Sequence, residues 1–319
     1  MRSFVSKYSQ YFVAFVGLIL VAYGGGRLYY HLTGGFTVGN IHSDFSFQPQ
    51  WEVRPLFTEE GQELASAIEQ SYFYLGKGCQ SYVFLSGDGE YVLKFFKYQR
   101  YRLHPWLEYF PSLSAVVEFR EQKKRQKWEK LDHFVQSWKL AFEHLKEETG
   151  LLFVHLNKTD NLIDKQLTLY DKMGRKHSIN LDNMEFCIQR RAQMLCDVLL
   201  AYKEERKERE AKTLIHELFQ LLLSEYRRGL GDQDHALMQN TGIVDGKPMH
   251  IDVGQFVWNE EFKKPFIFHQ ELFTKMYKFK NWLHYNYPEL EKVVEDELQQ
   301  IIGDKYLTMK PLFRKKELH

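Results

Sequence analysis

The stretch Tyr72–Lys97 reads YFYLGKGCQSYVFLSGDGEYVLKFFK, and it carries the strongest indication of the fold. Its apolar runs YFYL, SYVFL and YVLKFF are rich in aromatic and β-branched residues, which favour strands. The runs are separated by Gly-Lys-Gly and by Ser-Gly-Asp-Gly-Glu, and a Gly-Asp-Gly sequence is a hairpin signal. We therefore predict three consecutive antiparallel strands joined by tight turns.

The first of these turns, Gly76-Lys77-Gly78, has two interpretations. Glycines let backbone amides approach a phosphate without obstruction by a Cβ atom. A dinucleotide-binding loop is disfavoured, because Ser81 stands at the third glycine position and a strand follows instead of a helix. The turn is then either an ordinary hairpin turn or a loop that covers nucleotide phosphates, with Val83 packing on the base.

Lys94 lies in the strand after this turn. Strand alternation places Val92, Lys94 and Phe96 on one face, so the lysine points to a mostly apolar side of the sheet. A lysine there needs a carboxylate or a phosphate as its partner. The alternative is a surface lysine whose extended side chain reaches water.

Residues 116–149 are predicted to be helical, because Trp138, Ala141, Phe142 and Leu145 follow the spacing of one buried helix face. Upstream, EFREQKKRQKWEK holds six Lys or Arg residues and three Glu residues. Such a run is usually a solvated helix face, and contact with anionic lipid headgroups is the alternative. Thr149-Gly150 is predicted to end the helix, since glycine suits a left-handed cap.

Further along the chain, residues 151–156, 165–171 and 184–189 have strand-like sequences, and MGRK predicts a hairpin between the last two. After Arg191 the apolar spacing is helical over long stretches. Strands first and helices later predict an α+β protein with two lobes.

The N-terminus predicts a membrane anchor. Tyr11–Gly26 is apolar and uncharged, follows Arg2 and Lys7, and reaches a bilayer span when extended back to Tyr8. We expect residues 8–26 to lie in the lipid bilayer. A cleaved signal peptide and a buried core helix are the alternatives.

Composition excludes some function classes. The net charge of +1 gives no reason to expect nucleic acid as a partner. The cysteines, Cys79, Cys187 and Cys196, are odd in number and match no zinc or redox spacing, so a reducing compartment is expected.

Residues 227–256 read RRGLGDQDHALMQNTGIVDGKPMHIDVGQF and carry candidate chemistry. Phosphoryl transfer needs a carboxylate to orient the attacking hydroxyl and oxygen ligands for Mg²⁺. Asp232, Asp234 and Asn240 can supply these from one loop. A short hairpin then ends on Asp252, which Val253-Gly254 follows.

This order of features resembles the protein-kinase-like superfamily, in a remote and atypical form, over Tyr72–Phe256. The Ile-Asp-Val-Gly ending is also similar to that of small-molecule phosphotransferases and lipid kinases. The chain departs from the kinase pattern: Asp232-Gln233-Asp234 replaces His-Arg-Asp, and Val253 replaces the Phe of Asp-Phe-Gly. The interval from Asp234 to Asn240 is six residues instead of five, and no Ala-Pro-Glu follows. Because the chain after Phe256 is short, an unusual acceptor is favoured over a conventional peptide.

The resemblance implies ATP and Mg²⁺ as cofactors and a role for each matching residue. Asp234, with Asp232 sharing the work, would orient the acceptor, and Asn240 and Asp252 would bind Mg²⁺. Glu143 would pair with Lys94, with Glu147 and Glu129 as alternatives. The implied nucleotide-binding residues are Gly76, Lys77, Gly78, Ser81, Val83, Lys94 and Glu143.

We therefore expect a bilobal, kinase-like α+β fold, with an antiparallel-sheet N-lobe, a mostly helical C-lobe and an N-terminal hydrophobic helix. The expected parts are an anchor over 1–32, a linker over 33–50, the N-lobe with a basic helical insertion over 51–190 and the C-lobe with the catalytic and metal-binding loops over 191–319. The expected function is a membrane-tethered kinase or phosphotransferase that acts on a protein, lipid or small-molecule hydroxyl. A pseudokinase that binds or scaffolds, or an unrelated α+β protein, is the alternative.

The side of the membrane is open at this stage. Arg2 and Lys7 outweigh Arg27 across the apolar segment, which by the positive-inside rule places the body outside the cytoplasm. Use of ATP and free thiols favours the ATP-containing, reducing side. A secreted or host-delivered kinase would satisfy both.

Overall fold

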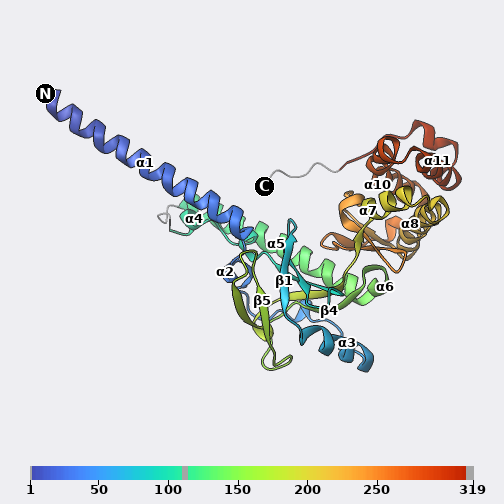
Figure 1. Ribbon diagram of the computed structural model, residues 1–319, viewed down its shortest axis with the longest axis horizontal. Coiled ribbons are helices and arrows are strands. Elements are labelled where there is room, and N and C mark those ends of the chain that lie inside the picture. Colours follow the sequence, from blue (N-terminus) through green and yellow to red (C-terminus); the bar gives the residue numbers. More distant parts are fainter. Residues whose placement is uncertain (1, 110–113, 314–319) are drawn as a thin grey trace.

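The computed structural model describes residues 2–109 and 114–313 (Figure 1). Helix α1, Arg2–Thr33, projects from the body of the protein (Figure 1). Its Tyr11–Thr33 part has a mean hydropathy of 1.6, and it is exposed except for Gly17, which is half-buried, and Thr33, which is buried. Among the described residues it is the one helix long and apolar enough to cross a membrane, and its exposure does not fit a core helix.

The sheet lobe is built on a seven-stranded sheet with the order β4-β7-β3-β2-β1-β5-β6. Neighbouring strands are antiparallel except β1 and β5, which are parallel. The strands are β1 Tyr72–Lys77, β2 Ser81–Ser86, β3 Tyr91–Phe96, β4 Leu151–His155, β5 Gln166–Tyr170, β6 Lys176–Asn180 and β7 Phe186–Arg190. The three strands predicted from the Tyr72–Lys97 stretch are confirmed as β1, β2 and β3.

The MGRK turn joins β5 to β6. The prediction placed this hairpin between β5 and the strand MEFCIQ, which is β7 and lies between β3 and β4. Strand β6 has the polar sequence KHSIN and buries one side chain, Ile179, so it carries little of the alternation that marks a strand. The polar strand was missed for this reason.

Helix α5, Ser114–His144, packs its apolar face against the sheet, with Phe134, Trp138 and Phe142 buried beside Phe96. A short helix α6, Lys146–Thr149, follows and ends at Gly150, whose φ of 61° is left-handed. The predicted helix over 116–149 is thus two helices, and the glycine cap is confirmed. The opposite face of the sheet is covered in part by α3, Thr58–Ile68.

Residues 33–50, for which composition indicates a linker, are packed into the sheet lobe. Phe36 is 1% exposed and Ile41, at the end of α2 (Val38–Ile41), is fully buried. Trp51, at the end of η1 (Pro49–Trp51), donates a hydrogen bond to Asp132 Oδ1 at 2.6 Å. A few apolar residues within a Gly- and Ser-rich segment are enough to hold it on the lobe.

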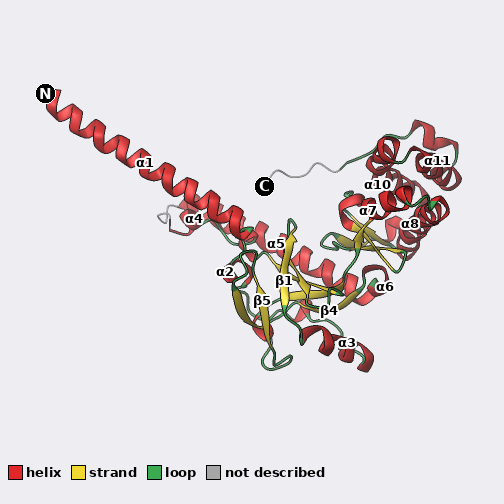
Figure 2. Ribbon diagram, in the orientation of Figure 1, coloured by secondary structure: helices red, strands yellow, loops and turns green. Residues whose placement is uncertain are grey.

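The second lobe is mostly helical (Figure 2). Its own core is formed by apolar residues of four long helices, separate from the two cores of the sheet lobe. The long helices are α7 Leu195–Glu204, α8 Glu208–Arg228, α10 Pro265–Asn286 and α11 Pro288–Ile302. The short elements of this lobe and its connection are β8 Gln193–Met194, β9 Leu230–Asp232, α9 Leu237–Asn240, β10 Thr241–Val244, β11 Lys247–His250, β12 Phe256–Trp258, η4 Glu260–Lys263 and η5 Asp304–Thr308, and those of the sheet lobe include η2 Tyr98–Arg100, α4 Pro105–Tyr109 and η3 Leu181–Asn183. The predicted two-lobed α+β architecture with an N-terminal apolar helix is confirmed.

Glu185 is a buried carboxyl group that helps to hold segment 33–50 on the sheet lobe. Its Oε1 accepts a hydrogen bond from Ser43 Oγ at 2.6 Å, and its Oε2 has no hydrogen-bond partner among the described residues. Burial raises the pKa of Glu185 to about 7, and the hydrogen bond from Ser43 opposes this rise. The folded protein therefore holds a proton that the unfolded chain releases near pH 4.5.

We expect Glu185→Gln to stabilise the protein above pH 7. Because its charged form is buried, the carboxyl group progressively lowers the free energy of unfolding as the pH rises from about 4.5 to about 7. Above about pH 7 this loss of stability stays constant. Removing the charge should add up to about 3 kcal/mol at pH 8 and almost nothing at pH 4.5. Urea unfolding at both pH values measures this. Glu261→Gln, at an exposed carboxylate, is the control, and equal effects of the two variants would contradict the prediction.

Candidate active site

A cavity of about 630 Å³ lies between the sheet lobe and the helical lobe. Side chains from β1, β2 and β3 line one wall, and α7 with the segments before and after the β10–β11 hairpin lines the other. The connection between the lobes closes its end. The lining residues are Leu75, Gly78, Ser81, Val83, Val92, Lys94, Trp138, Gln189 to Met194, Asp197, Val198, Ala201, Gln239, Ile251 and Asp252.

The Gly-rich turn between β1 and β2 forms part of the cavity wall. The backbone N–H of Gly78 donates to the Ser81 carbonyl at 3.0 Å, which closes the turn. Gly78, Ser81 and Val83 line the cavity as expected of nucleotide-binding residues. Gly76 and Lys77 are not among the lining residues, and Lys77 Nζ instead donates to the Gly34 carbonyl at 2.6 Å.

Lys94 reaches the cavity from β3, where it pairs across the sheet with Val83 of β2 and Cys187 of β7. Its side chain is buried, and its Nζ donates hydrogen bonds to Gln189 Oε1 at 2.6 Å and to the Ile251 carbonyl. Burial lowers the pKa of Lys94, while the charges of Cys187 and Asp252 oppose that shift. Lys94 and Asp252 therefore line the same cavity and interact electrostatically, without forming an ion pair.

Gln189 is the residue that positions Lys94, and the sequence analysis did not single it out. It is fully buried at the end of β7, and its Nε2 donates to the carbonyls of Thr149 and His250, the latter at 2.8 Å. Two carbonyl acceptors fix the orientation of the amide, so its oxygen faces Lys94. A polar residue at the end of the apolar strand sequence FCIQ was the available signal.

Glu143 does not lie where the resemblance implied. It accepts a hydrogen bond from the backbone N–H of Arg54 at 3.2 Å and lines a different cavity, of about 320 Å³. On α5, Trp138 contacts Lys94, and its ring centroid is 5.6 Å from Lys94 Nζ. Five residues further along a helix lie about 140° around its axis, so Glu143 points away. Glu147 and Glu129 are exposed and also do not meet Lys94.

Asp252 follows β11 and lies on the cavity wall. Its Oδ1 accepts a hydrogen bond from the Gly254 N–H at 3.3 Å. Burial raises the pKa of Asp252, and the charge of Lys94 opposes the rise. This carboxylate therefore stands at a point where a cation is electrostatically favoured.

Ser137 of α5 fastens the segment after Asp252. Its hydroxyl donates to the Val253 carbonyl and accepts from the Phe256 N–H at 2.6 Å. A Cβ atom at position 254 would lie 2.2 Å from Gln80 Oε1 and 3.0 Å from the Phe134 ring, so a larger residue there would force these side chains to shift. Gln80 belongs to the Gly-rich turn, so the turn and the Asp252 segment meet directly.

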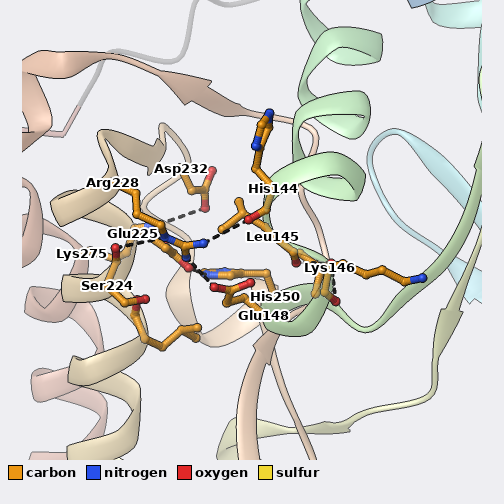
Figure 3. A network of polar contacts seen from close by, with 12 residues as sticks. His144, Leu145, Lys146, Glu148, Ser224, Glu225, Arg228, Asp232, His250 and Lys275 are labelled. Carbon is orange, nitrogen blue, oxygen red and sulfur yellow. Dashed lines mark hydrogen bonds and ion pairs between the residues drawn. The ribbon is translucent and has the colours of Figure 1, made fainter. Parts of the chain in front are cut away.

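Asp232 and Asp234 have different surroundings, although the sequence places them two residues apart. Asp232 is buried and forms an ion pair with Lys275 at 3.0 Å, in which both side chains are 3% exposed or less (Figure 3). Its Oδ1 accepts from the Asp234 N–H at 2.9 Å. Asp234 is half-buried, and its Oδ1 accepts from the Ala236 N–H at 2.9 Å. Asp232 is thus engaged in holding the loop, and Asp234 keeps one oxygen available.

Asn240 meets the Asp252 segment through its backbone, because its carbonyl accepts from the Ile251 N–H at 2.8 Å. Its side chain is not among those lining the cavity, whereas Gln239 is. Gln239 stands five residues after Asp234, which is the interval of the kinase motif. The sequence analysis chose Asn240 because it is the asparagine, and it missed Gln239.

A polar network behind the cavity connects the lobes (Figure 3). His250 Nε2 and Glu225 Oε1 are 2.5 Å apart, and both side chains are 2% exposed or less. Arg228 of α8 bonds to Glu148 and donates to the His144 carbonyl at 3.0 Å. Since the His250 carbonyl accepts from Gln189, contacts run continuously from α8 to Lys94. His250 therefore links the β10–β11 hairpin to α8.

The oxygen atoms on the cavity wall suit Mg²⁺ that is bound jointly by the protein and a nucleotide. Among the described residues, no group of three or more His, Cys, Asp or Glu side chains forms a metal site. Mg²⁺ is usually bound by one or two carboxylates plus substrate phosphates and water, instead of a full protein cage. Asp252 and the amide of Gln239, on the wall of one cavity, fit that mode of binding.

No protein-family model matches the chain, and no curated protein matches it. Solved structures that match include WbdD with the kinase inhibitor LY294002, at 14% identity, a TM-score of 0.31 and coverage of 74% of this chain and 46% of that one. Two others are of WbdD, a bifunctional kinase-methyltransferase, at 16% identity, TM-scores of 0.32 and 0.31 and coverage of 72% of this chain. The chain spans about half the length of those proteins, and a likeness this remote assigns no activity to it.

Proposed function

We propose that the chain is an ATP- and Mg²⁺-dependent phosphotransferase of kinase-like design. The observation that carries this proposal is that Lys94 and Asp252 both line one interlobe cavity, beside the Gly-rich turn. These residues lie 158 positions apart in the sequence, and the fold places a buried cation and a carboxylate on the wall of the same cavity. Phosphoryl transfer is accelerated mainly by such positioned charges.

Each residue has a proposed role, and all of these residues except Asp234 line the cavity. Lys94 would neutralise the α- and β-phosphates, and Gly78 with Ser81 would lie over them. Val83 and Val92 would pack on the base. Asp252, with the Gln239 amide, would hold Mg²⁺, which supplies positive charge to the transferring phosphoryl group. Asp234 would orient the acceptor hydroxyl through its available carboxylate oxygen.

A second candidate, a pseudokinase, is favoured by one specific observation. The ammonium group of Lys94 is held by the neutral amide of Gln189, and no helix carboxylate pairs with it among the described residues. A chain of this kind would bind nucleotide without transferring phosphate. Loss of transfer in Asp234→Ala, with nucleotide binding intact, separates the enzyme from the pseudokinase, because the latter has no transfer to lose.

The proposal includes a membrane tether formed by α1. Its length, its apolar composition and the exposure of most of Tyr11–Thr33 support insertion of residues 8–26 in a lipid bilayer. The body would then lie on the ATP-containing side. The phosphoacceptor, whether protein, lipid or small molecule, would be met at or near the membrane.

The proposed function is tested by measuring nucleotide binding to the full chain in detergent. Thermal unfolding with ATP, in the presence and in the absence of Mg²⁺, reports this binding. At a hundred times its Kd, ATP should stabilise the protein by about 2.7 kcal/mol. Lys94→Ala should lose the stabilisation, and Asp252→Ala should lose the part that depends on Mg²⁺. Lys292→Ala and Asp296→Ala, at an exposed ion pair on α11, are the matched controls. If ATP does not stabilise the parent protein, both the enzyme and the nucleotide-binding pseudokinase are ruled out.

A further inference from the structure

The C-terminal end of α1 is built into the sheet lobe. Phe36, three residues after α1, is buried with its ring 5.3 Å from that of Tyr82 and 5.2 Å from that of Phe84. The Gly35 carbonyl accepts hydrogen bonds from Tyr82 Oη at 2.5 Å and from Asn40 Nδ2 at 2.9 Å. Three residues reach about 10 Å when fully extended, so the lobe stays close to the end of the helix.

Cations from two separate turns of the sheet lobe surround the end of α1. Lys77, on the Gly-rich turn, lies 3.8 Å from the centre of the Tyr30 ring. Lys172, on the β5–β6 turn, donates to the His31 carbonyl at 2.9 Å, and Arg175 lies near the Tyr29 side chain. With Arg27 of α1 itself, these residues form what we call the collar: Arg27, Lys77, Lys172 and Arg175.

The collar carries more positive charge than the contacts within the protein neutralise. All four side chains are exposed. Lys77 and Lys172 each donate one hydrogen bond to a backbone carbonyl, although an ammonium group has three donors. The acid that contacts the collar, Asp171, is buried and shared between Arg175 and His177. Unused donors and net charge therefore face solvent around the base of α1.

The position of the collar along α1 indicates what it binds. The apolar segment ends at Thr33, and the half-exposed Tyr29 and Tyr30 stand in its last turns, where tyrosines of membrane helices meet the headgroup layer. We propose that the collar is a docking surface for anionic phospholipid headgroups, which seats the sheet lobe on the bilayer with the Gly-rich turn at the membrane surface. This rests on the tether that the proposed function includes. Each cation near an anionic surface favours docking by about fivefold, or about 1 kcal/mol.

A simpler role would also place cations here, because positive charge at the carbonyl end of a helix stabilises it. The two roles differ in their dependence on lipid. A helix cap acts equally in every bilayer, whereas headgroup binding requires anionic lipid and weakens with salt.

Cys79 provides a native probe, since it is exposed two residues after Lys77.

The test uses the full chain with Cys196→Ser in nanodiscs, with a bimane fluorophore on Cys79; Cys187 is buried. Quenching by lipid with a nitroxide on its headgroup is compared in phosphatidylcholine with and without phosphatidylglycerol. We expect phosphatidylglycerol to increase quenching, and high salt to reverse the increase. The triple variant Lys77→Gln, Lys172→Gln, Arg175→Gln should lose the increase, with the docked fraction reduced about fivefold per cation. Lys207→Gln, Lys212→Gln, Lys292→Gln removes as much charge from the helical lobe and should retain it.

Quenching that is equal in both lipids, or unchanged in the collar variant, overturns the proposal. A collar variant that loses thermal stability equally in both lipids assigns the cations to helix capping alone. Extraction of the chain from membranes by alkaline carbonate would show that α1 does not span the bilayer, which removes the basis of the proposal. None of these readouts depends on ATP, so failure of the proposed catalysis is detected separately.

Discussion

Asp232→Asn will lower the free energy of unfolding by about 3–5 kcal/mol, because it leaves the ammonium group of Lys275 buried without its carboxylate. Asp234→Asn, two residues away, will leave the stability within about 0.5 kcal/mol of the parent. It will instead reduce phosphoryl transfer by a factor of about 10²–10⁴, the usual contribution of a positioned acid or base. Urea unfolding and transfer of radiolabelled phosphate measure the two effects.

The double variant Asp232→Asn, Lys275→Met provides the control for this pair of aspartates. Removing both members of a buried ion pair costs less than removing one, so the double variant should recover stability over Asp232→Asn alone. Equal losses of stability in Asp232→Asn and Asp234→Asn would contradict the structural assignment of Asp232. Activity that survives in Asp234→Asn would show that this residue does not orient the acceptor.

Gln189→Met will weaken the use of ATP by between tenfold and a hundredfold, seen as a higher KM for ATP. A hydrogen bond to a charged group contributes about 1.5–3 kcal/mol, and methionine keeps the volume of the side chain but offers no oxygen to Lys94. Burial already lowers the pKa of Lys94, and loss of an acceptor for its charged form lowers it further. The KM should therefore rise at a lower pH in the variant than in the parent.

The pH profile separates positioning from a general loss of structure. A merely destabilised protein would lose activity in proportion to its folded fraction and keep the pH dependence of the parent. Gln166→Met, at an exposed glutamine on β5, is the matched control and should leave KM unchanged. A variant Gln189→Met with parental KM at every pH would show that the Ile251 carbonyl alone holds Lys94.

The local features of the fold were predictable because they depend on short-range rules. Alternation and turn residues identified β1 to β3, and the left-handed cap at Gly150 followed from its place at the end of a helical pattern. The helical spacing of Trp138 and Phe142 also indicated that Glu143 lies off their buried face and so does not face Lys94. For this residue, the helical spacing was a better guide than the resemblance to kinases.

The partners of Lys94 were beyond the reach of such rules. Gln189 meets Lys94 because β7 lies beside β3, and strand order is a tertiary property that the sequence of neither strand contains. The same holds for Asp232, whose partner Lys275 comes from α10. Spacing within a motif predicted a loop for the proposed chemistry, and only the packing around it separates a structural carboxylate from an available one.

Two residues connect α1 to Phe36, and Lys77 and Lys172 donate hydrogen bonds to carbonyls at the end of α1 and just after it, which has a consequence for how this protein would find its partners. A body fixed rigidly to an inserted helix keeps one orientation and one height, and it moves only by lateral diffusion and by rotation about the membrane normal. Encounters would then depend on the number of partner molecules per unit area of membrane and not on their concentration in bulk solution. Dilution of the lipid with detergent should slow reaction with a membrane-borne acceptor and leave reaction with a soluble one unchanged.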